Sequence, residues 1–200
     1  MIRNRASAEG GGLWNSAEGT FTVDDTLLRG NTARGDAADE GGGALFNDGG
    51  ALSVTDSTVR GNTATGEAGS GGGILNNGGV LTVEATTLLG NDAVRAGGGV
   101  ETTGGNVTLN DVNMRRNSAG DNPGNGGALH LTDAATVDWQ GGNVVNNDAA
   151  AEGGGLWNSA TGTLIADGLT LMGNTAPVGD DAFNDGGIFI HNGEPGPPGG

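Results

Sequence analysis

The sequence predicts an all-β fold, a right-handed parallel β-helix (β-solenoid) of about six to seven coils with three short strands in each coil. The first observation is a repeat with a period of 26 to 32 residues and fixed internal spacings. The second is that apolar and polar residues alternate inside each repeat, as they do in half-buried strands. The third is that segments rich in Gly, Asn and Asp separate the strands and interrupt any helical stripe. Stacked repeats of this length are typical of solenoids, and parallel crossovers are nearly always right-handed.

The first strand of each repeat follows a glycine-rich opening. Gly42-Gly43-Ala44-Leu45 and Gly71-Gly72-Gly73-Ile74 are two copies of this opening. The apolar residues that end these openings form one predicted core column: Leu13, Leu45, Ile74, Val100, Leu129, Leu156 and Ala182. Glycine pairs at such corners indicate positive φ angles or a close approach of two backbones.

The middle and third strands are separated by a constant offset. An apolar residue of the middle strand is always followed, seven residues later, by the apolar residue of the third strand, as in Leu52 and Val59. The middle-strand column is Phe21, Leu52, Leu81, Val107, Val137 and Leu164. The third-strand column is Leu28, Val59, Leu88, Met114, Val144 and Leu171. With a further apolar residue two positions after the middle column, these side chains predict a continuous core along the solenoid.

An asparagine closes each repeat, three residues after the apolar residue of the third strand. The six copies are Asn31, Asn62, Asn91, Asn117, Asn147 and Asn174. Asparagine tolerates the left-handed conformation, and its amide can bond to the same amide in the next copy. We therefore expect a structural ladder of asparagines at one corner.

The β-helix is expected to occupy residues 1–192, followed by a Gly/Pro-rich, collagen-like tail or linker at 193–200. Residues 2–6 match the close of a third strand, whereas residues 181–184 and 187–190 match a first and a middle strand. Two interpretations remain open. The chain is a fragment of a longer solenoid, or the N-terminal strand of one copy completes the last coil of the next and builds a filament.

The charge and the composition exclude several classes of protein. Asp and Glu number 24 against 8 arginines, no lysine is present, and the net charge is −16. Such a field repels phosphate, so we expect no nucleic-acid partner. No apolar run reaches the roughly 18 residues of a membrane span. The absence of cysteine excludes disulfides and thiolate metal sites.

Candidate chemistry is sparse, and we expect neither an enzyme nor a cofactor. The carboxylates lie mostly in turns and form no repeated outward column. Asp180 and Asp181 are the weak candidates for a Ca²⁺ site, because carboxylate oxygens are its preferred ligands. His130 and His191 lack metal-ligand partners at usable spacing and are expected on the surface.

A mixed column runs beside the first apolar column. Its members are Trp14, Phe46, Leu75, Glu101, His130, Trp157 and Phe183. A column that admits Glu and His is expected to face outward, which makes Trp14, Phe46, Leu75, Trp157 and Phe183 a candidate interaction stripe. Exposed aromatic residues in a row indicate an interface with another chain or the stacking of sugars. The third alternative is that loops cover the column. All three weaken if the column faces inward.

The openings GG[GA][LIV], followed by apolar-x-x-Asn, resemble the repeats of polymorphic outer-membrane proteins and related bacterial β-helix proteins, whose pattern is GGA[IVL] with FxxN. The resemblance covers about residues 1–190, with Leu, Val or Met where that family favours Phe. It implies a secreted or surface-displayed passenger that is adhesive, structural or, occasionally, polysaccharide-degrading.

The expected function is therefore that of an extracellular or cell-surface module, structural or adhesive. Its expected partners are further copies of itself, assembled head-to-tail or laterally, or a cell-surface glycan. The alternative is a carbohydrate-binding or polysaccharide-degrading β-helix protein.

Overall fold

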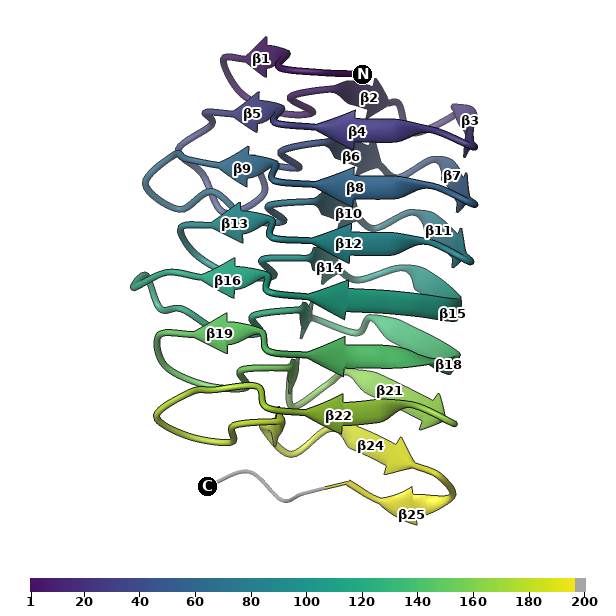
Figure 1. Ribbon diagram of the computed structural model, residues 1–200, viewed down its shortest axis with the longest axis vertical. Coiled ribbons are helices and arrows are strands. Elements are labelled where there is room, and N and C mark those ends of the chain that lie inside the picture. The colour runs from purple at the N-terminus through teal and green to yellow at the C-terminus, as the bar shows by residue number, and fades with distance from the viewer. Residues whose placement is uncertain (197–200) are drawn as a thin grey trace.

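The chain forms a parallel β-solenoid, described for residues 1–196 by a computed structural model. All of its regular elements are strands. Apart from β25 (Glu194–Pro195) and the strands of the end coils, each strand pairs in parallel with the equivalent strand one coil above and one coil below. In Figure 1 the chain crosses the front of the molecule from right to left while it descends, and it returns behind, so the solenoid is right-handed. Within residues 1–196 no helix is long and apolar enough to cross a membrane.

The first strands of the coils form a seven-stranded sheet. Its members are β2 (Leu13–Asn15), β6 (Leu45–Asp48), β10 (Ile74–Asn77), β14 (Val100–Thr103), β17 (Leu129–Thr132), β20 (Leu156–Asn158) and β23 (Ala182–Asn184). The predicted column is in register throughout, because Leu45 pairs with Ile74 and Ile74 pairs with Val100.

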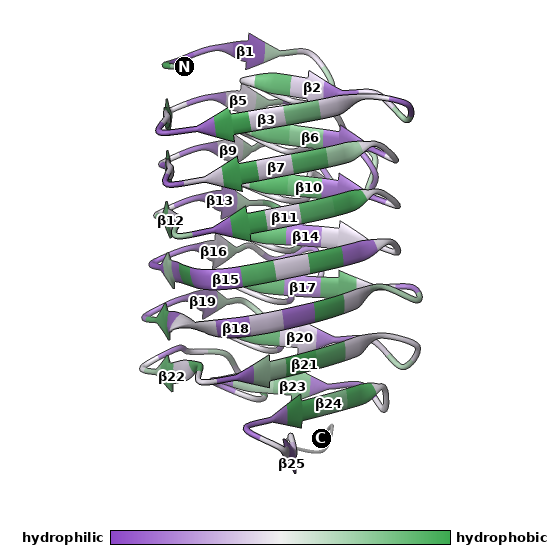
Figure 2. Cartoon of the chain, turned by 90° about the vertical axis from the view of Figure 1, so that its right-hand side faces the viewer, coloured by the Kyte–Doolittle hydropathy of each residue, from purple (hydrophilic) through white to green (hydrophobic). Residues whose placement is uncertain are grey.

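The middle strands form the main path of a second sheet, which is twelve-stranded in total. They are β3 (Thr20–Asp24), β7 (Ala51–Thr55), β11 (Val80–Glu84), β15 (Asn106–Arg115), β18 (Thr136–Val145), β21 (Thr163–Asp167) and β24 (Ile188–His191), with β25 (Glu194–Pro195) at the edge. Apolar and polar residues alternate along most of these strands (Figure 2), and the residues of the predicted middle column point inward, whereas Val80, Ile165 and Ile188 are exposed.

The third strands join the same sheet around a corner. They are β4 (Leu27–Arg29), β8 (Thr58–Arg60), β12 (Thr87–Leu89) and β22 (Thr170–Met172), while β15 and β18 continue around the corner without a break. The corner residue is left-handed in most coils, for example Asp56 at φ 46° and Asp111 at φ 50°. Asp at such a position is consistent with its tolerance of this region.

A fourth, very short strand follows each asparagine and was not expected from the sequence. These strands form a six-stranded sheet of β1 (Arg5–Ala6), β5 (Thr32–Ala33), β9 (Thr63–Ala64), β13 (Asp92–Ala93), β16 (Ser118–Ala119) and β19 (Asp148–Ala149). From β5 onward the alanines are buried. Two residues carry no periodicity, so sequence alternation cannot reveal such a strand.

The glycine pair that opens each repeat has two separate structural reasons. Gly42 adopts a φ of 63°, which other residues rarely adopt. Gly43 has an ordinary φ, but a Cβ on it would lie 2.6 Å from the backbone nitrogen of Thr63. The pair therefore lets the loop turn back and lets the start of the first strand approach the fourth strand of the same coil.

The core runs along the whole solenoid axis and contains the three predicted columns. Leu52, Leu81 and Leu88 are at most 3 % exposed, and Trp139, a large side chain, is 0 % exposed. The columns thin at the two ends, where Leu13, Phe21 and Leu171 are only partly buried against the cluster. The central coils therefore carry most of the hydrophobic stabilisation.

The asparagines form the expected ladder at one corner. The Nδ2 of Asn31 donates to Oδ1 of Asn62 at 2.9 Å, and Asn62 donates in the same way to Asn91. The backbone N–H of each asparagine donates to the same acceptor as its side chain. The ladder extends through Asn174, whose Nδ2 donates to Oδ1 of Asp181 at 2.8 Å.

The segment after residue 192 begins as part of the sheet. Strand β25 pairs antiparallel with β24, with Ile190 opposite Pro195 and His191 opposite Glu194. The boundary expected between residues 192 and 193 therefore lies inside a hairpin. Residues 197–200 of the expected collagen-like tail lie outside the described residues.

Candidate functional site

The mixed column of Trp14, Phe46, Leu75, Glu101, His130, Trp157 and Phe183 is aligned in the seven-stranded sheet. Its side chains alternate with those of the core column, and Phe46, Leu75 and Phe183 lie outside the main core cluster. The column therefore faces away from the solenoid interior, as expected.

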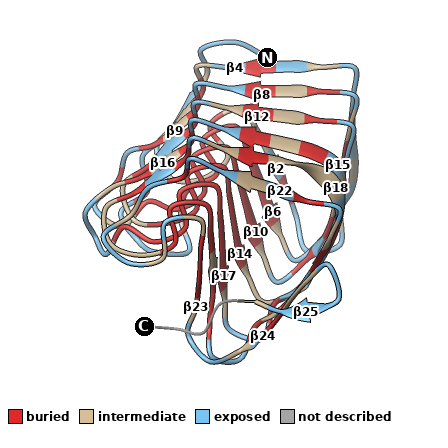
Figure 3. Ribbon diagram, turned by 60° about the horizontal axis from the view of Figure 1, so that its bottom comes forward, coloured by how far each residue is buried: buried red, intermediate tan, exposed pale blue. Residues whose placement is uncertain are grey.

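The expected exposure of this column is wrong for most of its members. Phe46 is 2 % exposed, Leu75 is 0 % and Phe183 is 7 %, whereas Trp14 in the first coil is 48 % exposed. The segments between the fourth strand and the next first strand lie against this side of the sheet (Figure 3). Of the three alternatives for the stripe (a protein interface, sugar stacking or cover by loops), the structure shows that loops cover it.

The covering loops form a layer of their own. The N–H of Thr65 donates to the carbonyl of Ala33, and the N–H of Val94 donates to the carbonyl of Ala64. Farther along the loops, Arg95 donates through its N–H to the carbonyl of Gly69. Loops of different lengths are thus tied coil to coil by backbone hydrogen bonds, which is why they can cover the column.

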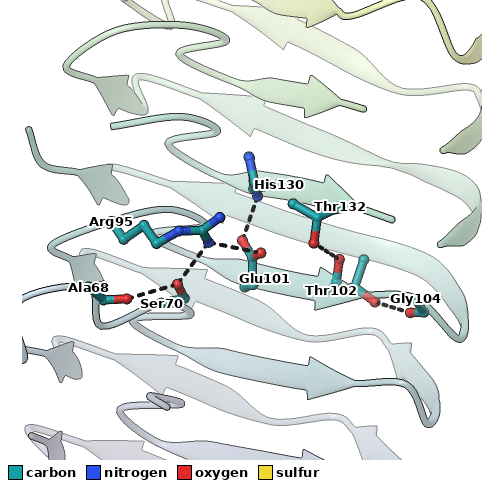
Figure 4. A network of polar contacts seen from close by, with 8 residues as sticks. All are labelled: Ala68, Ser70, Arg95, Glu101, Thr102, Gly104, His130 and Thr132. Carbon is teal, nitrogen blue, oxygen red and sulfur yellow. Dashed lines mark hydrogen bonds and ion pairs between the residues drawn. The ribbon is translucent and has the colours of Figure 1, made fainter. Parts of the chain in front are cut away.

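A charged cluster lies at the centre of the covered column (Figure 4). Oε2 of Glu101 lies 2.7 Å from Nδ1 of His130, and Oε1 lies 3.5 Å from Nη1 of Arg95. The same Nη1 donates to the hydroxyl of Ser70 at 3.1 Å. Glu101 is 0 % exposed and His130 only 2 %, so the expected surface position of His130 is wrong. A buried carboxylate is tolerated when its oxygens are paired, and these partners supply the pairing.

Aromatic stacking continues the cluster toward the C-terminal coils. The ring of His130 stacks on Trp157 with centroids 4.3 Å apart and an interplanar angle of 23°. Trp157 is also stacked, at 6.3 Å and 16°, on Phe183. Its Nε1 donates to the carboxylate of Glu152 at 2.9 Å. The column is therefore a second packed layer, and its only acid–imidazole contact is closed to a substrate by burial.

A second amide ladder was missed by the sequence reasoning. The Nδ2 of Asn15 donates to Oδ1 of Asn47 at 2.7 Å, and Asn47 donates to Asn76 at 2.7 Å. Asn76 then donates to the hydroxyl of Thr102, and Asn158 donates to Asn184. The signal was present, since an asparagine follows two residues after the first-strand apolar residue in Leu-Trp-Asn, Leu-Phe-Asn and Ile-Leu-Asn. Leu131 interrupts the column, which hides it as a repeat.

Asp180 and Asp181 accept hydrogen bonds from the backbone and from the asparagine ladder, respectively. Oδ1 of Asp180 accepts from the N–H of Ala176 at 3.1 Å, and Oδ1 of Asp181 accepts from Asn174. No group of three or more His, Asp or Glu side chains that could hold a metal ion occurs within residues 1–196. Asp181 therefore ends the ladder, and Asp180 bonds to the backbone of the loop that follows Asn174.

Comparisons with protein-family models, with curated proteins and with solved structures found no match to this chain.

Proposed function

We propose that this chain is an extracellular or cell-surface β-solenoid module with a structural or adhesive role. The observation that carries the proposal is that the repeated polar and aromatic columns tie the coils to one another. Asn62 and Asn91 are buried in the ladder, and Glu101 and His130 are buried beneath the loops. The outward faces of the middle and third strands then remain for contacts with a partner, on a support whose coils are held together by the columns.

The proposal includes the repeat type, that of the polymorphic outer-membrane proteins. This assignment is supported by the structural roles of the two parts of the pattern, the opening glycines and the closing asparagine. The opening glycines provide the left-handed corner and the close approach at Gly42 and Gly43. The closing asparagine provides the ladder, as at Asn62.

A polysaccharide-degrading β-helix is the alternative function. General acid–base work on a glycosidic bond needs carboxyl groups within reach of the sugar. The carboxylate that lies in direct contact with an imidazole, Glu101, is 0 % exposed. A catalytic pair would have to come from exposed carboxylates, such as Asp24 and Glu84 at the ends of middle strands.

Head-to-tail assembly is an alternative arrangement for the same structural role. Strands β2 and β3 are the outermost members of their sheets at one end. At the other end the edge of β24 is already paired with β25, and Asp181 takes the last ladder contact from Asn174. These contacts occupy part of the edge that a second copy would need. We therefore propose that the module acts as a monomer in preference to a filament.

The proposed role is tested with beads coated with the purified protein. Beads should adhere to bacterial or epithelial cell layers above the level of albumin-coated beads, and light scattering of the free protein should give the mass of one chain. Adhesion at the albumin level, together with release of reducing or unsaturated sugars from a polysaccharide panel, would favour the enzyme. A mass that grows with protein concentration would favour the filament.

A further inference from the structure

The arginines are not spread evenly over the surface. Five of the eight, namely Arg3, Arg29, Arg60, Arg115 and Arg116, lie on the side formed by the third strands. We call this side the arginine face: the outward positions of β4, β8, β12 and β22, the matching ends of β15 and β18, and the left-handed corner that follows each strand. It faces the viewer in Figure 1.

The arginine face contains no carboxylate. None of its outward or corner positions is Asp or Glu, so the other 3 arginines and all 24 acids lie elsewhere in the chain. Within residues 1–196 the ion pairs are confined to Glu101 with Arg95 and His130. The five guanidinium groups of the face are therefore positive charges without an acidic partner, in a chain of net charge −16.

The register places these charges in a line along the solenoid axis. Arg29 pairs directly with Arg60, and Leu89 lies between Arg60 and Arg115 in the same column. Neighbouring parallel strands are about 4.8 Å apart, so Arg29 and Arg60 are close like charges, which destabilise a sheet. A bound anion that bridges adjacent guanidinium groups would remove this repulsion.

Arg116 occupies a position for which its backbone is poorly suited. It has a φ of 53° at the corner where the three preceding coils have Gly30, Gly61 and Gly90, all at similar positive angles. A long side chain in this region is strained, whereas glycine is not. Strain of this kind is often stored at functional sites, and here it adds a second guanidinium beside that of Arg115.

A depression of about 460 Å³ lies on the face next to these two arginines. Its wall includes Arg115 and Arg116, its apolar surface comes from Leu89 and Val145, and Asn146 adds an amide. The volume is within the usual range of small-molecule sites. Guanidinium groups bind carboxylate or sulfate, amides bind hydroxyls, and the aliphatic side chains suit the C–H face of a sugar.

We propose that the arginine face binds an acidic polysaccharide, with one charged sugar in the depression and the chain running along the axis toward Arg60 and Arg29. The inference rests on the proposed adhesive role and names its ligand class. A linear polyanion matches a line of cations that are one and two coils apart. The apolar and amide side chains in the wall of the depression favour a sugar ring over a bare phosphate backbone.

The test is binding to immobilised chondroitin sulfate and polygalacturonate, with dextran as the neutral control, measured by interferometry. Wild-type protein should bind both acidic polymers and not dextran, and its affinity should fall steeply with salt. Arg115→Gln combined with Arg116→Gly should weaken binding by about ten-fold or more, because two charge-assisted contacts are lost. Arg34→Gln, which removes an exposed arginine from a covering loop, should leave the affinity unchanged.

The glycine variant separates binding from folding. Arg116→Gly places in the corner the residue that the preceding coils use, so its melting temperature should equal or exceed that of the wild type while its binding falls. Equal affinity for dextran and the acidic polymers, or equal affinities of the double variant and Arg34→Gln, would overturn the inference. Dimers that form without glycan and disappear in the double variant would also overturn it, in favour of a second copy as the partner. Beads coated with the double variant that adhere to cells as well as the wild type would overturn it while leaving the adhesive role in place.

Discussion

Asn91 shows how one buried side chain holds three coils together. Its Nδ2 donates to Oδ1 of Asn117 and to the carbonyl of Val59, at 3.0 Å each. Its Oδ1 accepts from both the backbone and the side chain of Asn62. All of the polar atoms of the amide are thus satisfied at 0 % exposure, which is the condition for burying an amide without a penalty.

Replacing Asn91 by Ala should lower the free energy of unfolding by about 2–4 kcal/mol, since the polar groups of Asn62 and Asn117 would lose partners inside the protein. Urea unfolding followed by circular dichroism measures the loss. Asn106→Ala, at an exposed outward position, should change it by less than about 0.5 kcal/mol. Equal effects of the two substitutions would show that the asparagine ladder does not stabilise the fold.

The Glu101–His130 pair gives a second prediction at the residue scale. Glu101→Leu alone should cost about 3–5 kcal/mol, because it leaves His130 and Arg95 without their acidic partner in a buried site. Adding His130→Trp should recover most of that loss, since Leu75 and Trp157 already occupy the neighbouring positions of the column. A double variant that is less stable than Glu101→Leu would show that the pair is not replaceable by apolar packing.

Residue-scale features were predictable where they repeat without interruption. The first asparagine ladder is present in every coil, so the spacing alone predicts it. The second ladder is broken by Thr102 and Leu131, and the partners of Glu101 come from a loop and from the next coil. Neither the alternation nor the period of the sequence shows which residues lie next to Glu101 in the folded chain.

At the scale of elements, the middle strands follow their sequence pattern closely. In β11, Leu81 and Val83 are buried and the intervening Thr82 is half-buried on the outward side. The alternation predicts which side chain enters the core, because successive residues of a strand point to opposite faces.

Leu81→Ala should lower the free energy of unfolding by about 2–5 kcal/mol, through lost transfer energy and a cavity in a central coil. Thr82→Ala, its neighbour in the same strand, should cost less than about 1 kcal/mol. Thermal or urea unfolding of the two variants compares them directly. Melting temperatures that are equally unaffected would reverse the inward and outward assignment of the strand.

The position of the loops could not be predicted from the sequence. Their lengths vary and their residues show no alternation, so nothing in the sequence distinguished loop cover from an exposed stripe. Their order comes from backbone hydrogen bonds between coils, such as that from Val94 to Ala64, which any residue type can make.

Tryptophan fluorescence tests the loop cover in solution. Trp139 is 0 % exposed, Trp157 is partly covered and Trp14 is 48 % exposed. Acrylamide should therefore quench mainly the emission of Trp14, and Trp14→Phe should remove the most accessible component of the quenching curve. If Trp157→Phe removed as much accessible emission as Trp14→Phe, the loops would not cover the column.

At the scale of the whole molecule, charge is unevenly distributed. The net charge is −16, yet the arginine face holds no carboxylate. Most acids lie in turns and at corners, where Asp also serves the left-handed backbone, as Asp25 and Asp56 do. The negative charge is thus partly a consequence of the many corners of a solenoid.

Calcium should have little effect on stability. Asp180 and Asp181 accept hydrogen bonds from the chain itself, and residues 1–196 contain no cluster of carboxylates of the size that a metal ion needs. Millimolar Ca²⁺ should raise the melting temperature by no more than a few degrees, and EDTA should not unfold the protein. A rise above about 10 °C would show that the turn carboxylates bind the ion in the folded state.

The parallel, in-register stacking of the coils is tested most directly by engineered disulfides, because the chain has no cysteine of its own. Thr58 and Thr87 are outward neighbours in adjacent coils, whereas Thr58 and Asn113 are two coils apart in the same column. Adjacent parallel strands place Cα atoms about 4.8 Å apart, inside the range of a disulfide, and the two-coil distance of about 9.6 Å lies outside it. Oxidation should therefore crosslink the variant with cysteines at 58 and 87 almost completely, without loss of β-sheet circular dichroism, and should leave the variant with cysteines at 58 and 113 reduced. Crosslinking of the second pair in preference to the first would contradict the solenoid register.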